Sequence, residues 1–239
     1  MKILILILGF TILLATGIRA TAQEVHLSDV KIVGAMKNVM WKGELNGTID
    51  LDTISERQHL YGFGPVEYLT GEILIIDGIS YKASLKNDSE IMVEETFKIK
   101  APFFAYANVE KWKELDLPDS ILSINQLEIF LDQLTLTAIR PFIFKLKGIV
   151  EKAVIHIVNV PAGTIVRSPS DVHSRQKNFY LTDEQTEIIG FFSTEHKAIF
   201  THHNTFLHMH LITEDKQRMG HLDDANFKSG TIKLYLPED

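Results

Sequence analysis

The sequence predicts a strand-rich α+β fold that forms a single compact unit. Most of the chain after residue 22 carries strand signals, and one segment has the periodicity of an amphipathic helix. No internal repeat, low-complexity tract or linker divides this part of the chain. The chain has 239 residues, of which 23% are charged and 9% aromatic. This composition is typical of a folded globular protein and not of a disordered or fibrous one.

The first 22 residues are set apart from the predicted fold. Lys2 precedes an apolar run from Ile3 to Ile18, and the segment ends in Arg19-Ala20-Thr21-Ala22. A charged start, a hydrophobic stretch and a small-residue cleavage site are typical of a secretory signal peptide. The run is short for a transmembrane span. We therefore expect cleavage after Ala22, an exported domain of residues 23–239 in the periplasm or medium, and no membrane attachment thereafter.

The charge of the chain argues against polyanionic partners. The net charge is -7, and removal of Lys2 and Arg19 leaves 22 basic against 31 acidic residues, or -9. A domain this acidic without basic runs is not expected to bind nucleic acid or an anionic membrane. Cysteine is absent, so neither disulfides nor thiolate ligands are available.

One hairpin and one helix are predicted most clearly. An apolar run, Asp77-Gly78 and an alternating run form a strong hairpin signal over Gly71–Ala83. A helix is expected after Ser123 as N-cap, with Gln126 three residues on. Its apolar face would contain Leu127, Phe130, Leu131 and Leu134. Val30–Trp41 is ambiguous between strand and helix, and 159–177 reads as a long loop. Further strands are expected at Ile91–Ile99, Phe103–Val109, Phe142–Leu146, Ile149–Val158, around Phe179, and at Glu187–Phe192, Phe206–Ile212 and Thr231–Leu236.

Two histidines lie on one face of the strand Phe206–Ile212. Because side chains alternate along a strand, His208 and His210 project the same way, about 7 Å apart. The residues between and beside them are apolar on both faces, which is typical of a buried strand. Buried imidazoles need partners. A chance pair on a surface strand is the alternative interpretation.

A third histidine follows a predicted turn. The polar stretch 213–220 would return the chain so that His221 lies beside His208 and His210 on a paired strand. Three imidazoles without cysteine commonly hold a catalytic zinc ion with an open coordination position. The other histidines are interpreted differently. His202 and His203 are expected to be exposed, and His26, His59, His173 and His196 to be structural or superficial.

Two more residues are candidates for the site. Glu72 opens an apolar strand, so its carboxylate either points to water or reaches the metal as an acid or base. His156 shares a strand face with Val150, Val154 and Val158. This pattern favours an inward position, where His156 contacts the substrate or is held by structural partners.

These motifs resemble the signature of the α-acetolactate decarboxylases. The resemblance rests on Phe206 to Lys216 with Gly220-His221, on Gly62-Phe63-Gly64 with Leu69-Thr70-Gly71-Glu72, and on the segments 145–148 and 190–191. It implies a mixed α/β fold with sheet and small barrel parts, and a homodimer. It also implies Zn²⁺ bound by His208, His210 and His221, with Glu72 as an active-site residue. The reaction implied is conversion of 2-acetolactate, a 2-hydroxy-3-oxo acid, to acetoin and carbon dioxide. The metal would polarise the ketone as a Lewis acid.

The sequence also departs from the family pattern. The family's active-site arginine aligns with His156, and a threonine of the Glu72 motif aligns with Pro65. We expect no counterpart of the glutamate that the family carries on a C-terminal tail. Histidine is a poor substitute for a bidentate arginine. Two alternatives therefore stay open: an exported metal-binding protein of this fold without decarboxylase activity, and a cupin-like metalloenzyme suggested by His208-x-His210 with Glu214.

Overall fold

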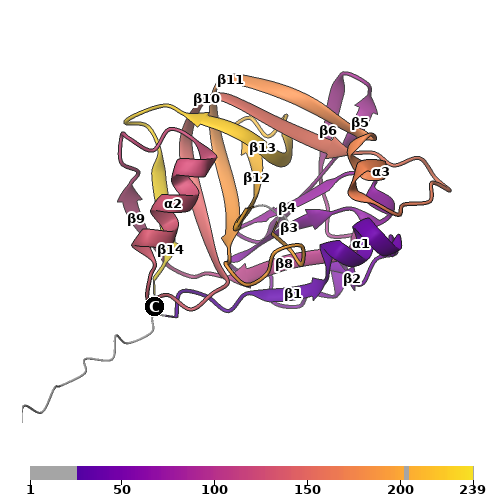
Figure 1. Ribbon diagram of the computed structural model, residues 1–239, viewed down its shortest axis with the longest axis horizontal. Coiled ribbons are helices and arrows are strands. Elements are labelled where there is room, and N and C mark those ends of the chain that lie inside the picture. Colours follow the sequence, from indigo (N-terminus) through magenta and orange to yellow (C-terminus); the bar gives the residue numbers. More distant parts are fainter. Residues whose placement is uncertain (1–25, 202–204, 239) are drawn as a thin grey trace, which may run out of the picture.

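The computed structural model describes residues 26–201 and 205–238, which form two packed β-structures with three helices around them (Figure 1). The predicted signal peptide and the residues His202 and His203 lie outside the described part of the chain. The strand-rich α+β architecture predicted from the sequence is confirmed. In the described residues, no helix combines the length and the apolar character needed to cross a membrane.

The first sheet is built from the N-terminal half of the chain. Its six strands are arranged in the order β1-β8-β3-β4-β5-β6. Their bounds are β1 Lys31–Gly34, β3 Leu60–Pro65, β4 Glu72–Ile76, β5 Ile79–Asn87, β6 Glu90–Glu95 and β8 Phe103–Asn108. A separate two-stranded ladder pairs β2 (Ile49–Asp50) with β7 (Lys100–Ala101). Short 3₁₀ turns cover Leu51–Thr53 and Glu67–Leu69.

The predicted hairpin forms strands β4 and β5 of this sheet. Strands β4 and β5 pair in antiparallel register, with Ile76 opposite Ile79. Asp77 and Gly78 connect them with φ angles of 46° and 79°. Positive φ at both central residues is the signature of a type I′ turn, which matches the twist of the strands. The turn thereby sets the register that places Glu72 at the start of a buried strand.

The second sheet contains the C-terminal half and closes on itself. Its strands are β9 Trp112–Asp116, β10 Phe142–Val158, β11 Gln176–Phe192, β12 Leu207–Thr213, β13 Met219–Phe227 and β14 Lys233–Pro237. Strand β10 pairs with both β11 and β13, and β12 joins these two. The four strands therefore form a closed ring, the small barrel expected from the resemblance. Strands β14 and β9 extend the sheet from the other half of β10.

Strand β10 is longer than the sequence suggested. Two strands were predicted on either side of Gly148, whereas the structure contains one strand of 17 residues. Gly148 has φ 152°, and a Cβ atom there would lie 2.3 Å from the Thr231 carbonyl oxygen. The glycine lets the backbone bend within the strand without ending it. The bent strand can then pair with different partners along its length.

The helices cover the edges of the two β-structures. The ambiguous segment 30–41 contains both predicted elements, β1 followed by α1 (Met36–Lys42). The predicted helix α2 spans Ile124–Leu134, and Ser123 accepts a hydrogen bond from the Gln126 N–H as predicted. Leu127 and Leu131 are buried, but Leu134 is 45% exposed, because the helix ends there. The predicted loop 159–177 contains a short helix, α3 (Pro169–His173).

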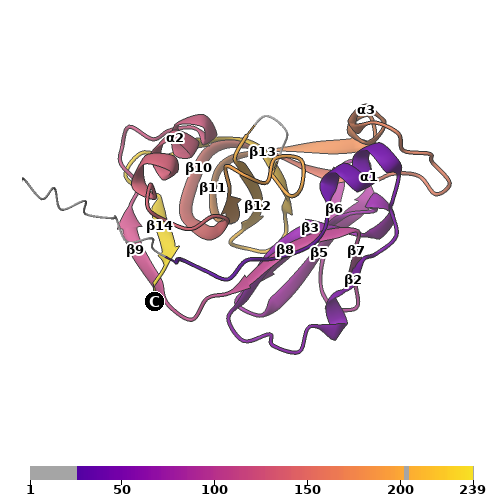
Figure 2. The same cartoon turned by 60° about the horizontal axis from the view of Figure 1, so that its bottom comes forward.

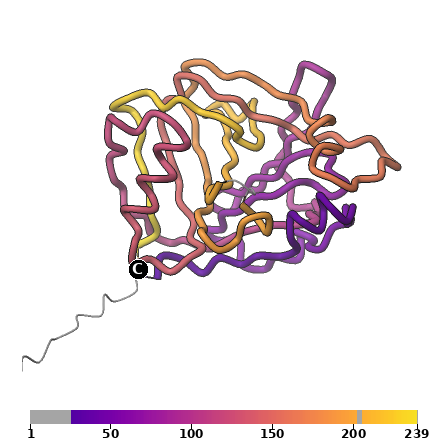
Figure 3. Tube along the Cα trace, viewed as in Figure 1, coloured from indigo at the N-terminus to yellow at the C-terminus, as the bar shows by residue number. Residues whose placement is uncertain are grey.

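Two of the four apolar clusters in the described residues fill the space inside and beside the ring. One fills the ring and packs under α2, with members such as Leu131, Ile155 and Leu211. The other lies between the first sheet and the outside of the ring, with members such as Phe63, Leu74 and Ile212. Figures 2 and 3 show the first sheet lying against the ring strands. Leu207, Met209 and Leu211 face the ring interior, as alternation along β12 requires. His208 and His210 therefore project toward the first sheet.

Candidate metal centre

Three histidines converge between the ring and the first sheet. His208 and His210 lie on β12, and His210 is the direct cross-strand partner of His221 on β13. Their ring centroids are 5.5 Å (208–210), 5.0 Å (208–221) and 5.5 Å (210–221) apart. All three side chains are buried, with exposures of 4%, 1% and 6%. The hairpin return predicted for His221 is present in the structure.

The spacing of the rings suits one shared ion. Zinc–nitrogen bonds of 2.0–2.1 Å at tetrahedral angles place the centroids of coordinating imidazoles about 5 Å apart. The three measured separations, 5.0–5.5 Å, all lie near this value. An all-imidazole set without thiolate suits zinc and related divalent ions. The three residues therefore fit a divalent metal ion.

Hydrogen bonds at Nδ1 orient two of the rings. The Nδ1 atom of His208 lies in hydrogen-bond contact with the Phe200 carbonyl, and Nδ1 of His221 lies 3.0 Å from Oδ1 of Asp223. A ring held at Nδ1 in this way presents Nε2 as the ligand atom. Burial lowers the pKa of His221, and the neighbouring His156 lowers it further. The neutral imidazole is the form that binds a metal.

An aromatic side chain from the first sheet packs against two of the rings. Phe63 on β3 stacks on His210 with centroids 4.4 Å apart and an interplanar angle of 14°. The same phenyl ring meets His208 edge-on, at 4.7 Å and 75°. Phe63 is fully buried, so its position is fixed by the core around it. The first sheet thus restrains rings that the second sheet carries.

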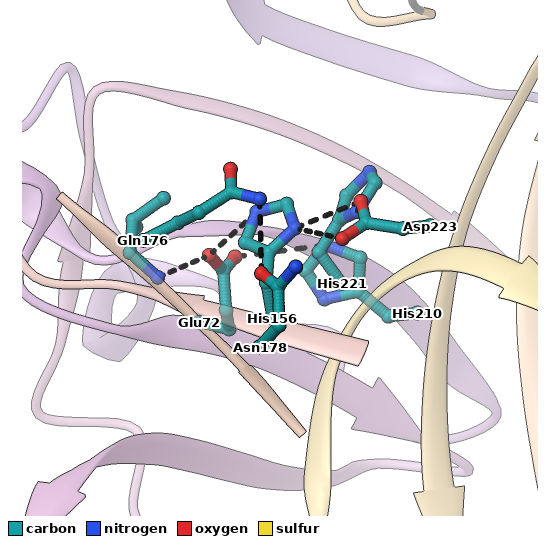
Figure 4. Close-up of polar contacts among 8 residues, drawn as sticks. Glu72, His156, Gln176, Asn178, His210, His221 and Asp223 are labelled. Atoms are coloured by element: carbon teal, nitrogen blue, oxygen red, sulfur yellow. Dashed lines mark hydrogen bonds and ion pairs between the residues drawn. The ribbon is translucent and has the colours of Figure 1, made fainter. Parts of the chain in front are cut away.

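Glu72 also comes from the first sheet and lies within the cluster (Figure 4). Its Oε2 atom is 3.7 Å from His210 Nε2, its Oε1 atom is 4.0 Å from His156 Nε2, and it is only 3% exposed. Burial raises the pKa of Glu72 well above its usual range, and the charge of Asp223 raises it further. The hydrogen bond from the Val158 N–H, 3.3 Å, opposes this shift. The Glu72 carboxylate therefore lies within the histidine cluster and does not point to water.

His156 lies beside His221 and shares a carboxylate with it. The two rings stack with centroids 4.5 Å apart. Nδ1 of His156 is 2.8 Å from both Asp223 oxygens, so the same carboxylate contacts both histidines. Burial alone would raise the pKa of Asp223, but the hydrogen bonds from His156 and His221 outweigh it and hold the pKa below its usual range. An ionised Asp223 can therefore orient both rings.

A second group of donors overlaps the first. Among the described residues, ligand atoms of His156, His221 and Asp223 lie within 4.8 Å of one another and could hold a metal ion. The oxygens of Asp223, however, are already at hydrogen-bond distance from Nδ1 of both rings. This geometry suits a carboxylate that orients histidine ligands from behind. Asp223 therefore suits the role of orienting His156 and His221 better than that of a metal ligand.

Two cavities meet at the histidine cluster. The inner chamber has a volume of about 60 Å³ and is bordered by α1 and α3. The outer cavity, about 580 Å³, opens on the side of α2. Four histidines line both cavities: His156, His173, His208 and His221. In the described part of the chain, neither lining contains a lysine or an arginine. His173 is exposed, as expected for a surface residue, yet it also borders the site.

Three contributors to the cluster were not predicted from the sequence. Asp223 could have been found, because it lies two residues after His221 on the same strand and so on the same face. Phe63 and the Phe200 carbonyl carry no such signal. Their positions depend on the packing of segments far apart in the chain.

Comparison with known proteins places this geometry in a family. The family model described as alpha-acetolactate decarboxylase matches residues 33–238. The alpha-acetolactate decarboxylase of Streptococcus thermophilus is 24% identical over 219 residues, covering 89% of this chain and 85% of that protein. The crystal structure of acetolactate decarboxylase from Bacillus subtilis subspecies spizizenii superimposes with a TM-score of 0.71 at 18% identity, covering 88% and 86%.

A third protein has the same fold. A Staphylococcus aureus protein described as of unknown function and similar to alpha-acetolactate decarboxylase gives a TM-score of 0.70 at 20% identity, covering 87% and 84% of the two chains. These structural likenesses establish the fold, and the family match extends over most of the sequence. Both the predicted fold and the predicted resemblance are confirmed. The chain belongs to the alpha-acetolactate decarboxylase family.

Proposed function

We propose that this protein decarboxylates 2-acetolactate to acetoin with the help of a divalent metal ion, zinc in the first instance. The observation that carries this proposal is the arrangement of His208, His210 and His221 at ring spacings that suit one ion, with Glu72 3.7 Å from His210. Family membership supports decarboxylation of acetolactate as the reaction type. The cupin-like alternative has no comparable support.

Decarboxylation produces negative charge on the substrate, and the site must stabilise this charge. When carbon dioxide leaves, the electron pair of the broken carbon–carbon bond moves toward the neighbouring ketone oxygen. A bound zinc ion would supply the Lewis acidity that stabilises this charge. His208, His210 and His221, whose side chains are buried, would hold the ion. Electrostatic interactions are stronger in a buried site than in water.

Glu72 would donate the proton that takes the place of carbon dioxide on the substrate. Its carboxyl is buried beside the proposed metal ligands, and a carboxyl group in this position can act as a general acid. The carboxyl oxygens face both His210 and His156, at the point where the cluster meets the inner chamber. We infer that Glu72 delivers this proton to the carbon that has lost carbon dioxide.

His156 would contact the substrate from the position that the family pattern gives to arginine. Asp223 contacts its Nδ1 atom, so the ring turns its Nε2 edge toward Glu72 and the chamber. A single imidazole nitrogen makes one contact where a guanidinium makes two. We propose that this contact orients the substrate carboxylate.

A second candidate function is metal binding without turnover. It is favoured by one observation: the described residues that line both cavities include no lysine or arginine to bind a carboxylate.

We further propose that the protein is exported after cleavage at Ala22 and forms a homodimer. N-terminal sequencing of secreted protein and light scattering check these two statements.

One assay separates the two candidate functions. Purified protein is incubated with 2-acetolactate, and acetoin and carbon dioxide are measured beside the metal content. Equal amounts of both products from a protein with one zinc ion per chain support the decarboxylase. One tightly bound zinc ion with no acetoin would instead support the metal-binding protein.

A further inference from the structure

Two segments at the mouth of the inner chamber are basic, although the chain as a whole is acidic. Residues 31–43 contain three lysines and no acidic residue, a charge of +3. Residues 159–177 contain Arg167, Arg175 and Lys177 against Asp171, a charge of +2. Because the whole chain carries -7, all other residues together carry -12. The two segments thus carry net positive charge, whereas the rest of the chain taken together is negative.

Both segments border the chamber. Helix α1 contributes Met36, Met40 and Trp41 to its lining. Helix α3 contributes Pro169, Val172 and His173. The two segments also touch, because a Cβ atom on Gly43 at the end of α1 would lie 2.7 Å from the Val166 carbonyl oxygen. Figure 2 shows α1 and α3 side by side at one end of the molecule.

Three exposed basic residues lie within two positions of a lining residue in the sequence, and we call them the basic rim: Lys37, Arg167 and Arg175. Lys37 precedes Trp41 by four residues, so the two share one side of α1. Arg167 follows Val166, the residue that approaches Gly43. The Arg175 backbone N–H donates to the Val172 carbonyl at 2.8 Å, which keeps it against α3.

The charges of the rim are little neutralised. Within residues 26–201 and 205–238, no carboxylate oxygen lies within ion-pair distance of Lys37, Arg167 or Arg175. Lys42, by contrast, lies 4.0 Å from Glu44. Asp171, the one acidic residue of its segment, accepts hydrogen bonds from the Ser168 hydroxyl and from the backbone N–H groups of Arg167 and Ser168.

The other approach to the histidines has the opposite sign. The outer cavity is lined by Glu128, Asp223 and Asp224, with no lysine or arginine among its described residues. An anion that approaches from the α2 side meets carboxylates first. An anion that approaches between α1 and α3 passes the basic rim. The field of exposed charges acts over about 10 Å at 0.1 M salt, so the rim can act on a substrate before contact.

We propose that the basic rim attracts the carboxylate of an anionic 2-hydroxy-3-oxo acid and makes the α1–α3 side its route to the histidine cluster. This rests on the proposed function, since it assigns a role in binding the substrate of that site. The rim stands at the surface and takes no part in the chemical step. The rim therefore raises kcat/KM, by an amount that falls as salt is added, and leaves kcat unchanged.

The test compares two variants of equal charge. In the first, Lys37, Arg167 and Arg175 are all replaced by Gln. In the matched control, Lys111, Lys113 and Lys147 are replaced by Gln. These lysines are exposed: Lys111 precedes β9, Lys113 lies on β9, and Lys147 on β10 pairs with Lys233 on β14. Figure 1 shows β9 and β14 at the opposite end of the molecule from α1 and α3. Acetoin formation from 2-acetolactate is measured from 10 to 500 mM NaCl. The methyl ester of 2-acetolactate, which is uncharged, serves as an inhibitor whose Ki is measured in parallel.

At 10 mM NaCl, the rim variant is expected to lose about tenfold in kcat/KM relative to wild type and control, with kcat unchanged. Its dependence on salt should be weaker, and the curves should converge at 500 mM NaCl, where screening is strong. The Ki of the ester should be equal in all three proteins. Equal kcat/KM values and salt dependence in the rim and control variants would overturn the proposal. If wild-type protein makes no acetoin, the proposed function fails, and the rim is then judged on its own by binding of radiolabelled 2-acetolactate.

Discussion

His210 and His221 face each other across the antiparallel pair β12–β13, with ring centroids 5.5 Å apart. This pairing follows from the turn between the two strands, which returns the chain so that His221 lies opposite His210. His208 completes the cluster from the same face of β12.

Asp223 is expected to strengthen metal binding through the two rings that it contacts. Asp223→Asn removes the charge behind His221 and His156 while keeping the size of the side chain. Outer-shell carboxylates of this kind typically contribute about 10–100-fold to metal affinity. We expect the Kd for zinc, measured by competition with a chelator, to rise by this factor. The neighbouring exposed residue provides the control: Asp224→Asn should bind zinc as wild type does.

Phe63 is expected to act on the site and not only on stability. Phe63→Leu removes the ring stacked on His210 and should destabilise the fold by roughly 1–3 kcal/mol. Zinc affinity should fall as well, because His208 and His210 lose a common restraint. Phe142→Leu is matched for burial and lies in a stacked pair with Phe192, away from the cluster. A similar loss of stability with unchanged zinc affinity is expected there. If both variants bind zinc equally, Phe63 is a core residue only.

Glu72 is expected to matter for turnover more than for metal binding. Glu72→Gln keeps the shape of the side chain in its buried position but cannot donate a carboxyl proton. General acid groups typically contribute about 10²–10⁴-fold to rate, so kcat should fall by this factor with zinc content unchanged. Glu67→Gln, on the surface side of the same motif, serves as the control. Loss of zinc from the Glu72 variant would instead identify Glu72 as a ligand.

Tyr61 on β3 contacts Trp112 on β9 and so links the two β-structures. We expect its buried hydroxyl to make the protein less stable at high pH. Burial raises the pKa of Tyr61 to about 12, against the hydrogen bond from Trp112, 3.3 Å, which lowers it. The unfolded chain therefore releases this proton near pH 10, while the folded protein retains it to about pH 12. The retained proton therefore stabilises the folded protein at pH values below 10, and this stabilisation is lost as the pH rises from 10 to 12.

Urea unfolding at several pH values tests this. Tyr61→Phe has no such proton, so its stability should fall less than that of wild type between pH 10 and 12. Tyr180→Phe, at an exposed position, should follow wild type. Identical alkaline behaviour of the Tyr61 variant and wild type would show that Tyr61 is not buried in solution.

Local signals predicted much of this fold. Asp77-Gly78 specified its hairpin, and Ser123 with Gln126 specified the start of α2, because each depends on neighbouring residues alone. The prediction of two strands separated by Gly148 was wrong, because β10 continues through this glycine. A glycine that bends a strand and one that ends it are identical in sequence, and the partner Thr231 lies far along the chain.

The site was predictable to the extent that it follows strand alternation. His208 and His210 could be placed on one face, and His221 on the returning strand. The approach of Glu72 to His210 joins two sheets whose packing no local pattern encodes. The same holds for Phe63. His173 was interpreted as a surface residue, and only the fold of 159–177 shows that this surface borders the site.

The most direct test of the account is a zinc titration of chelator-treated protein, with acetoin formation followed at each step. We predict no acetoin without metal, and a linear rise in acetoin formation that ends at one zinc ion per chain. His221→Ala, which removes the histidine common to both donor groups, should give no acetoin at any zinc concentration. Full activity in metal-free protein, or zinc bound one per chain without acetoin from wild type, would contradict it.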